Sequence, residues 1–417
     1  MHLQSRNRKA PVLTLALSMR NSYNPDSMNS TLSGAGIALD GHELTVDAGA
    51  RVLVDGRSPR AGDGVAAALA RRVVPDLAAD SPERTIAVDQ TNTSVIVDDR
   101  YVVKIVARWA AADRAGTLLE RLAAAGSDDV ARLFGRVLWQ HPRWGTSTLA
   151  LITEFLDGAS DGWTWAVDDV LAAVTGGPEP DWPGPLGRLV ARVHDVLGAD
   201  AEPAAADAGA TRYRRAADAL AEAVAAASGP SGARLLNRRT SLEDAMRTLR
   251  QAAPGVEFAI HGDLHVGQVL ASPMPDGGRR FTLIDFDGDP RLDVDSRARP
   301  DAAARDLAHM TVSFDLVAAV AQRRLGRAEP RAFDWADRAR AAFLAAYRTE
   351  LRTPGLFDES LLPGFEAEQL AAELLYADRF LPLWRYAPDA VITYRHPSSD
   401  DHPEEPWTPP PFDPTSS

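Results

Sequence analysis

The chain has 417 residues, a formal net charge of −13 and no cysteine. The lack of cysteine excludes disulfide bonds and thiolate metal sites, and the acidic balance argues against binding to the phosphate backbone of nucleic acids. Hydrophobic residues make up 45% of the chain, and the length is typical of two or three domains or lobes. No apolar stretch reaches about 18 residues, so we expect a cytoplasmic protein with neither a nucleic-acid nor a membrane partner.

Both ends of the chain have the composition of loose segments. Residues 1–30 are polar apart from a short apolar run, Val12–Met19, that follows basic residues. This faintly resembles a signal peptide, but the run is short and no clean small-residue cleavage site follows it. We interpret 1–30 as a disordered leader, with secretion as the alternative, and the Pro-rich residues 396–417 as a disordered tail.

The region after the leader is rich in predicted strands. Asp-Gly turns interrupt alternating apolar positions, and β-branched residues flank a turn at Asp98-Asp99-Arg100, which predicts a hairpin. The predicted elements are short strands between 35 and 58, a helix over Val65–Val74, strands over Ser94–Val97 and Tyr101–Val106, a helix over Ala110–Ala125 that Gly126 ends, and strands over Val137–Trp139 and Thr148–Phe155.

The rest of the chain is predicted to be helical, with small strand insertions. An Ala/Pro-rich loop is expected over 198–210, and two apolar strands are expected over Glu257–His261 and Phe281–Phe286. The predicted helices are Asp168–Val174, Leu186–Leu197, Tyr213–Ala227, Ser241–Ala252, Asp301–Leu325, Trp335–Glu350 and Gly364–Trp384.

Two segments carry the chemistry, AIHGDLHVGQVL (259–270) and FTLIDFDGDP (281–290). Phosphoryl transfer needs a carboxylate that orients the attacking hydroxyl and takes its proton, and metal ions held by hard oxygen ligands. Asp263 and Gln268 have the Asp-x-x-x-x-Asn spacing of protein kinases, with Gln in place of Asn, and Asp285 precedes Phe286 like the second metal ligand. Asp287 adds a carboxylate beside it.

Each of these residues also has a structural interpretation. Asp263 would suit a turn or a helix N-cap, and His261 and His265 would suit hydrogen-bonded structural positions. A zinc site on the two histidines is an alternative, but no helical His-Glu-x-x-His motif supports it. The combination of the loop with a strand-terminal Asp285 favours a kinase-like site.

Together these segments resemble the actinobacterial maltokinases, within the aminoglycoside-phosphotransferase-like kinase superfamily. Residues 89–106 resemble the family's N-lobe hairpin, 148–169 its hinge and following helix, and 305–310 its helix start after the metal loop. The resemblance implies an α+β, bilobal, protein-kinase-like fold that uses ATP and magnesium. It implies an N-terminal cap over 31–83, a nucleotide-binding N-lobe over 84–156 and a helical, catalytic and sugar-binding C-lobe over 157–395.

The resemblance also implies site residues. Asp263 would orient the acceptor hydroxyl, and Gln268 and Asp285 would hold magnesium on the phosphates. Lys104 would pair with ATP phosphates, with an edge-strand lysine facing water as the alternative. The loop 90–94 would cover the phosphates through residues that include Asn92, Thr93 and Ser94, although it lacks the Gly-x-Gly-x-x-Gly pattern and would also suit a plain hairpin turn.

Two further nucleotide contacts are expected. Kinases hold the lysine with a helix-borne acid, and the family's Glu falls near Thr117; of Asp113 and Glu120 we favour Glu120, for which a solvated helix face is the alternative. Backbone groups near Glu154, Phe155 and Leu156 would bind adenine.

The acceptor pocket is expected among the C-terminal helices, in ELLYADRFLPLWRYAPD (373–389). This segment departs from the maltokinase pattern and resembles the actinobacterial glucosamine kinases. Flat aromatic faces suit a sugar ring, and carboxylates suit the ammonium group of an amino sugar. We rank glucosamine first as acceptor, maltose second and an aminoglycoside third. The expected sugar contacts are Asp263, His261, Glu366, Glu373, Asp378, Trp384 and Arg385.

Alternatives from other classes remain open. A nucleotide-binding pseudokinase would fit the Gln268 substitution and the uncertain helix acid, although Asp263, Asp285 and Lys104 are present together. Trp384 and its neighbours would also suit simple core packing, and Arg305 is expected in a structural ion pair. We expect a monomer or a dimer that acts on a small sugar.

Overall fold

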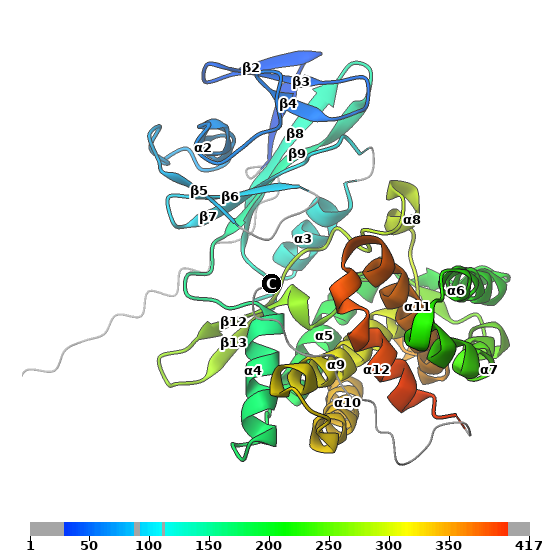
Figure 1. The fold of residues 1–417 in the computed structure, drawn as a ribbon. Helices are drawn as coiled ribbons and strands as arrows, with labels where there is room; N and C mark the ends of the chain where they lie inside the picture. Colours follow the sequence, from blue (N-terminus) through cyan, green and yellow to red (C-terminus); the bar gives the residue numbers. More distant parts are fainter. Residues whose placement is uncertain (1–28, 87–91, 111–112, 399–417) are drawn as a thin grey trace, which may run out of the picture.

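The computed structural model describes residues 29–86, 92–110 and 113–398. It has a strand-rich N-terminal lobe above a larger helical lobe (Figure 1). The predicted leader 1–30 and tail 396–417 lie mostly outside the described residues. His396 is described, and its ring Nδ1 lies 2.9 Å from Ser241 Oγ.

Six strands of the described residues form the main sheet, in the order β1-β8-β9-β7-β6-β5. The predicted hairpin is confirmed as β6 and β7, with Ser94 opposite Lys104. Asp98 and Asp99 both have positive φ, 55° and 49°, as the mirror-image turns of tight hairpins require. The strands are β1 (Asn29–Ser33), β5 (Glu83–Thr85), β6 (Thr93–Val97), β7 (Tyr101–Ile105), β8 (Leu133–His141) and β9 (Gly145–Glu154).

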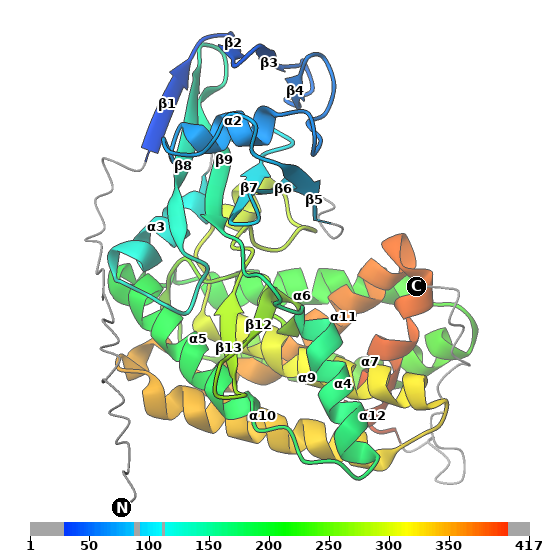
Figure 2. The same ribbon diagram turned by 90° about the vertical axis from the view of Figure 1, so that its left-hand side faces the viewer.

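The expected cap shares this sheet with the expected N-lobe. β1 pairs in parallel with β8, and β5 pairs with β6, so the expected boundary at 83 and 84 falls inside a strand. Helix α2 (Val65–Arg71) is buried over most of its length and lies against the sheet (Figure 2). Three other strands of the N-terminal lobe, β2 (Gly36–Leu39), β3 (His42–Val46) and β4 (Val52–Val54), form a second small sheet.

Helix α3 (Arg114–Ala124) lies between the two lobes (Figure 1). Asp113 caps its N-terminus by accepting a hydrogen bond from Gly116 N. The predicted helix over 110–125 is therefore confirmed with a later start, because the Asp113 side chain satisfies a backbone donor that begins the first turn.

The helical lobe is built around α9 (Ala303–Leu325), which is buried along nearly its whole length. α4, α10, α11 and α12 pack against α9, and α5 packs against α10. The bounds are α4 (Gly162–Val174), α5 (Pro183–Leu197), α6 (Ala208–Ala225), α7 (Gly229–Gln251), α8 (Val294–Ala298), α10 (Pro330–Glu350), α11 (Leu362–Phe380) and α12 (Tyr386–Arg395), with single 3-10 turns η1 (Gly198–Asp200), η2 (Val266–Gln268), η3 (Pro354–Leu356), η4 (Glu359–Leu361) and η5 (Pro382–Trp384).

Three predictions in this lobe were wrong in extent. The helix predicted over 364–384 ends at Phe380, because Leu381 leaves the helical conformation (φ −138°, ψ 69°) and Pro382 has no N–H to continue the helical hydrogen bonds. The strand predicted over 257–261 is only β11 (Val256–Glu257), paired with β10 (Glu202–Pro203). The strand predicted over 281–286 is β13 (Arg279–Leu283). It pairs with β12 (Val269–Pro273), a strand that the sequence analysis did not predict.

Candidate active site

Asp306 of α9 holds the backbone of the loop that carries Asp263. The backbone N–H groups of His261 and Gly262 donate to its carboxylate at 2.6 and 2.8 Å. His194 Nε2 lies 3.2 Å from the same carboxylate, and His194 Nδ1 lies 2.8 Å from Tyr347 Oη. Burial alone would raise the pKa of Asp306, but the hydrogen bond and charge of His194 outweigh it and hold the pKa at about 2. A buried, ionised aspartate therefore fixes the two residues that precede Asp263.

His261, predicted as a sugar contact, is a structural part of this loop. Its ring is 1% exposed. Nε2 lies 2.9 Å from Ile284 O, and Nδ1 lies 3.3 Å from the Asp263 N–H. Burial lowers the pKa of His261, which favours the neutral ring. With Nε2 as donor and Nδ1 as acceptor, both nitrogens are used to shape the loop.

Asp263 itself is poised to accept a proton. Its side chain is 19% exposed, and Gln268 Nε2 donates to Oδ2 at 3.4 Å. Burial and then the negative charge of Asp289 raise the pKa of Asp263 well above 3.8, while Arg291 opposes the rise. A raised pKa makes this carboxylate a stronger base than an ordinary surface aspartate.

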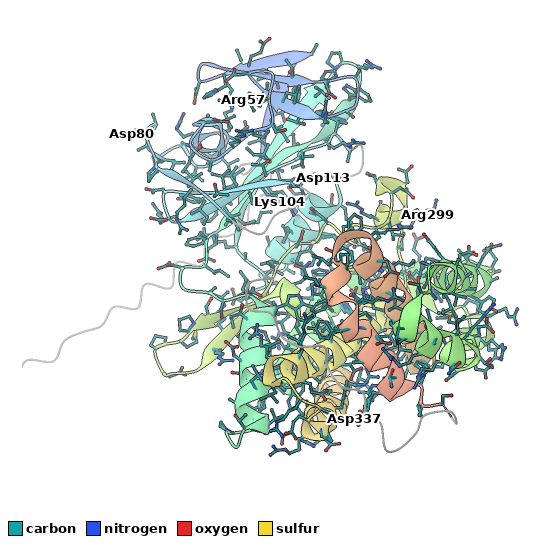
Figure 3. The ribbon with its side chains drawn as sticks, in the orientation of Figure 1. Arg57, Asp80, Lys104, Asp113, Arg299 and Asp337 are labelled. Atoms are coloured by element: carbon teal, nitrogen blue, oxygen red, sulfur yellow. The ribbon has the colours of Figure 1, made fainter. Side chains whose placement is uncertain are left out.

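A second loop, after β13, brings Asp285 and Asp289 close enough for their charges to act on Asp263. Asp285 has a positive φ of 62°, and Ile284 N donates to Gln268 O at 3.0 Å, which places Gln268 next to this loop. Lys104 Nζ lies 2.8 Å from Asp285 Oδ1 and 2.7 Å from Asp287 Oδ2. Burial would lower the pKa of Lys104, but these two carboxylates hold it above its ordinary value. Lys104 lies on the side of its sheet that faces the helical lobe (Figure 3).

The expected phosphate loop meets the same carboxylates. Asn92 Nδ2 donates to Asp287 Oδ2 at 2.8 Å. Thr93 Oγ1 donates to Pro59 O at 3.4 Å, and Ser94 lies opposite Lys104 in the ladder. Gln90 and Thr91 lie outside the described residues.

The prediction that Glu120 holds Lys104 was wrong. Glu120 accepts hydrogen bonds from Arg136 Nε at 2.8 Å and from Asn29 Nδ2 at 2.8 Å. Asp113 also pairs with Arg136. The acids of α3 thus fasten the helix to β8 and β1, and Lys104 takes its partners from the loop of Asp285 instead.

The hinge segment uses part of its hydrogen-bonding capacity internally. Glu154 N donates to Arg132 O and Phe155 N to Arg100 O, both at 2.9 Å. An adenine contact at this segment would therefore use carbonyl oxygens or Leu156.

Two of the predicted sugar contacts, Glu373 and Trp384, lie beside the Asp263 loop. Trp384 Nε1 donates to Glu373 Oε2 at 3.3 Å, and Gln369 Nε2 donates to Oε1 at 2.8 Å. The Trp384 ring packs edge-to-face on Trp163 at 5.3 Å between centroids, and Trp163 lies 5.9 Å from His265. Burial raises the pKa of Glu373, as it does for Asp263.

The charge of Arg291 acts on both Asp263 and Glu373, and sequence reasoning missed this residue. It donates to Asp289 Oδ2 at 2.7 Å and to Gln369 Oε1 at 3.3 Å, and its charge opposes the pKa rise of both Asp263 and Glu373. Its position two residues after a loop aspartate was visible in the sequence, but only the fold brings it against α11. Arg305 makes the expected structural ion pairs, with Asp289 and Asp301.

Three predicted sugar contacts take other roles. Glu366 accepts hydrogen bonds from Arg340 at 2.6 Å and Thr311 at 2.9 Å, in a separate cluster between α9, α10 and α11. Asp378 and Arg385 form an ion pair with each other. Arg385 Nε also donates to Ser231 Oγ at 3.1 Å, so this pair fastens the start of α12 to α7.

Comparison with known proteins identifies the family. The sequence model of the phosphotransferase enzyme family matches residues 83–288. A glucosamine kinase of Streptacidiphilus jiangxiensis is 38% identical over 372 residues, which are 81% of this chain and 82% of that protein. The chain belongs to the phosphotransferase enzyme family. The glucosamine kinase of Mycolicibacterium smegmatis is 37% identical over 324 residues, 74% of this chain and 78% of that protein.

Solved structures confirm the predicted α+β kinase fold of this phosphotransferase family member. A glucosamine kinase crystal structure has a TM-score of 0.77 at 34% identity and covers 87% of this chain and 94% of its own. A glucosamine kinase in complex with glucosamine, ADP and inorganic phosphate has a TM-score of 0.74 at 34% identity, over 87% of this chain and 93% of its own.

No helix of the described residues is long and apolar enough to cross a membrane. No group of three or more His, Asp or Glu side chains there is arranged to hold a metal ion.

Proposed function

We propose that this phosphotransferase is a glucosamine kinase that transfers the γ-phosphoryl group of ATP to the 6-hydroxyl of glucosamine. The observation that carries the proposal is Asp263, a largely buried carboxylate whose pKa is raised by burial and by neighbouring charges. Those charges include Asp285 of the Lys104–Asp285–Asp287 group and Glu373 of the Glu373–Trp384 pair. The first group suits a polyphosphate and the second suits an amino sugar.

The residues present fit the chemistry of direct in-line transfer. Asp263 accepts the proton of the sugar hydroxyl while the hydroxyl oxygen of the sugar forms a bond to the γ-phosphorus. The bond from that phosphorus to the bridging oxygen of ADP breaks at the same time. Lys104, already held beside the loop carboxylates, neutralises phosphate charge. The phosphoryl group passes directly to the sugar, so no covalent phosphoenzyme is required.

Magnesium fits the donor set of this site. Asp285 and the amide oxygen of Gln268 are hard oxygen ligands on adjacent loops, and magnesium is commonly held by one or two carboxylates together with substrate phosphates. When bound, it would neutralise the phosphate oxygens. The two protein ligands alone do not form a three-residue site, so the nucleotide would complete the coordination.

The Glu373–Trp384 pair supports an amino sugar as acceptor. A carboxylate on the sugar side offers an ionic hydrogen bond to an ammonium group, and an indole face offers a flat apolar surface to a pyranose ring. Arg291 forms an ion pair with Asp289, a further carboxylate near Asp263, and so limits the negative charge of the pocket.

The test is ADP release in the presence of magnesium across glucosamine, N-acetylglucosamine, glucose, maltose and an aminoglycoside. We expect turnover with glucosamine and little with N-acetylglucosamine, because acetylation removes the positive charge. Turnover with maltose but not glucosamine would overturn the acceptor assignment. ATP binding without turnover of any sugar would favour the pseudokinase alternative.

A further inference from the structure

Arg114, the first residue of α3, reaches out of the N-terminal lobe into the helical lobe. Its Nη2 donates to the carbonyl oxygens of Ile260 and His261, the latter at 2.9 Å. These carbonyls belong to the two residues before Gly262-Asp263. A side chain of the N-terminal lobe therefore forms hydrogen bonds with the backbone of the loop that carries the proposed base.

Two glycine turns are shaped around this guanidinium. Gly262 and Gly288 have positive φ, 84° and 79°. A Cβ atom added to Gly262 would lie 3.0 Å from Arg114 Nη2 and 3.4 Å from Gly288 Cα, and one added to Gly288 would lie 3.0 Å from Arg114 Nε. Gly262 precedes Asp263 and Gly288 follows Asp287, so the guanidinium touches the turns of both functional loops.

The base of Arg114 is itself held firmly. Its neighbour Asp113 caps α3 and accepts hydrogen bonds from Arg136 and Thr148. Arg136 also binds Glu120 at 2.6 Å through Nη2. The acids of α3 thus fix the helix to the sheet of Lys104, and the arginine connects that sheet to the helical lobe.

We infer that Arg114 is a positioning residue that holds the Asp263 loop and the Asp285–Asp287 loop in register with each other and with Lys104. Arg114 Nη2 donates to both carbonyls, while Nε and Cζ of the same planar group pack against the Gly288 turn, and a lysine ammonium has no such plane to fill that space. The role rests on the proposed function for its kinetic consequence, but the contacts themselves do not depend on it.

The test compares Arg114→Ala with Arg121→Ala. Arg121 lies on the same helix and also donates to a helical-lobe carbonyl, Leu197 O at 2.9 Å, and it pairs with Asp200, away from both loops. In the nucleotide-free protein, hydrogen exchange of the backbone amides at 261–266 and 285–289 is expected to quicken in Arg114→Ala only. Unchanged exchange there, or equal quickening in Arg121→Ala, would overturn the inference.

Measurements of kcat and KM test for a change that a loss of stability alone would not produce. A small misplacement of reacting groups costs about 100-fold in rate, so kcat of Arg114→Ala is expected to fall by about that factor with little change in the KM for glucosamine. Guanidinium at millimolar concentration is expected to restore part of kcat in Arg114→Ala, and to do nothing for Arg121→Ala. A rise in KM alone, or no rescue, would contradict positioning.

The test distinguishes failure of the proposed function from misfolding of the variant. If wild-type protein fails to phosphorylate glucosamine, the proposed function fails and the exchange measurement alone decides the role of Arg114. If Arg114→Ala does not show a cooperative thermal transition, Arg114→Lys replaces it. That variant keeps a cation but not the planar group that packs against the Gly288 turn, so quickened exchange in the two loops supports the inference and wild-type exchange overturns it.

Discussion

Glu373→Gln is the most informative change at the acceptor site. Glu373 is a partly buried carboxylate on α11 that accepts hydrogen bonds from Gln369 and Trp384. Glutamine has nearly the same volume and keeps one acceptor oxygen, so the substitution mainly removes the negative charge. If Glu373 binds the ammonium group of glucosamine, the loss should depend on the charge of the sugar.

The expected magnitude follows from the strength of ionic hydrogen bonds. A hydrogen bond to a charged group contributes about 1.5–3 kcal/mol, which corresponds to a fall in kcat/KM of about 10- to 150-fold for glucosamine. Glucose presents a neutral hydroxyl at the same carbon, and a neutral hydrogen bond contributes about 0.5–1.5 kcal/mol. The ratio of kcat/KM for glucosamine to that for glucose should therefore fall.

The assay is initial-rate ADP release with each sugar at saturating ATP. Glu366→Gln is the matched control, because it lies on the same helix two turns earlier and removes the same charge. Its carboxylate pairs with Arg340 at 2.6 Å in a separate cluster, so it is expected to lower thermal stability and leave the glucosamine-to-glucose ratio unchanged.

Equal falls in kcat/KM for glucosamine and glucose in Glu373→Gln would refute this reasoning. They would show that Glu373 shapes the pocket through its bonds to Gln369 and Trp384 and has no direct part in recognising the amine. A changed sugar ratio in Glu366→Gln would refute the assignment of that residue to structure.

Further predictions concern the base, the metal loop, the aromatic face and stability. Asp263→Asn is expected to lower kcat by about 100-fold or more while a fluorescent ATP analogue still binds, as the loss of a general base does; undiminished turnover would remove Asp263 from the mechanism. Asp285→Asn is expected to raise the magnesium concentration needed for nucleotide binding, because one anionic ligand is lost, and an unchanged requirement in a titration would contradict this. Trp384→Ala is expected to raise the KM for glucosamine more than the KM for ATP, and equal changes would assign Trp384 to packing. Burial lowers the pKa of His396 from 6.5 to about 4, so the unfolded chain takes up this proton first. The resulting stability is present above pH 6.5 and is lost as the pH falls toward 4, by at most about 3 kcal/mol. His396→Gln is expected to flatten this part of the pH profile of urea unfolding, and a profile like that of the wild type would count against it.

Local sequence patterns predicted the parts of the fold that local interactions decide. The β6–β7 hairpin follows from β-branched residues around the Asp98-Asp99 turn, and the buried helix α9 follows from a long apolar pattern. The parallel pairing of β1 with β8 joins Asn29 to Arg136, more than a hundred residues apart, and no local pattern specifies such a partner.

The candidate site divides in the same way. Asp263, Gln268 and Asp285 carry a spacing that reports their chemistry, and the structure brings them together. The partner of Lys104 could not be predicted, because any acid on a nearby helix or loop would satisfy its charge, and the fold supplies Asp287 where the sequence suggested Glu120. Arg114 carried no signal at all, since an arginine at a helix start usually faces solvent.

The break after α11 is what brings together Glu373 and Trp384, the pair proposed to bind the sugar. In an unbroken helix, Trp384 would lie eleven residues beyond Glu373, about 16 Å along the axis. Pro382 ends the helix, and the η5 turn folds the chain back so that the Trp384 indole reaches Glu373 Oε2 at 3.3 Å. The Asp378–Arg385 ion pair and the Arg385–Ser231 hydrogen bond attach this turn to α11 and α7. These two residues, predicted to touch the sugar, thus support the aromatic face that lies beside it in the proposed complex.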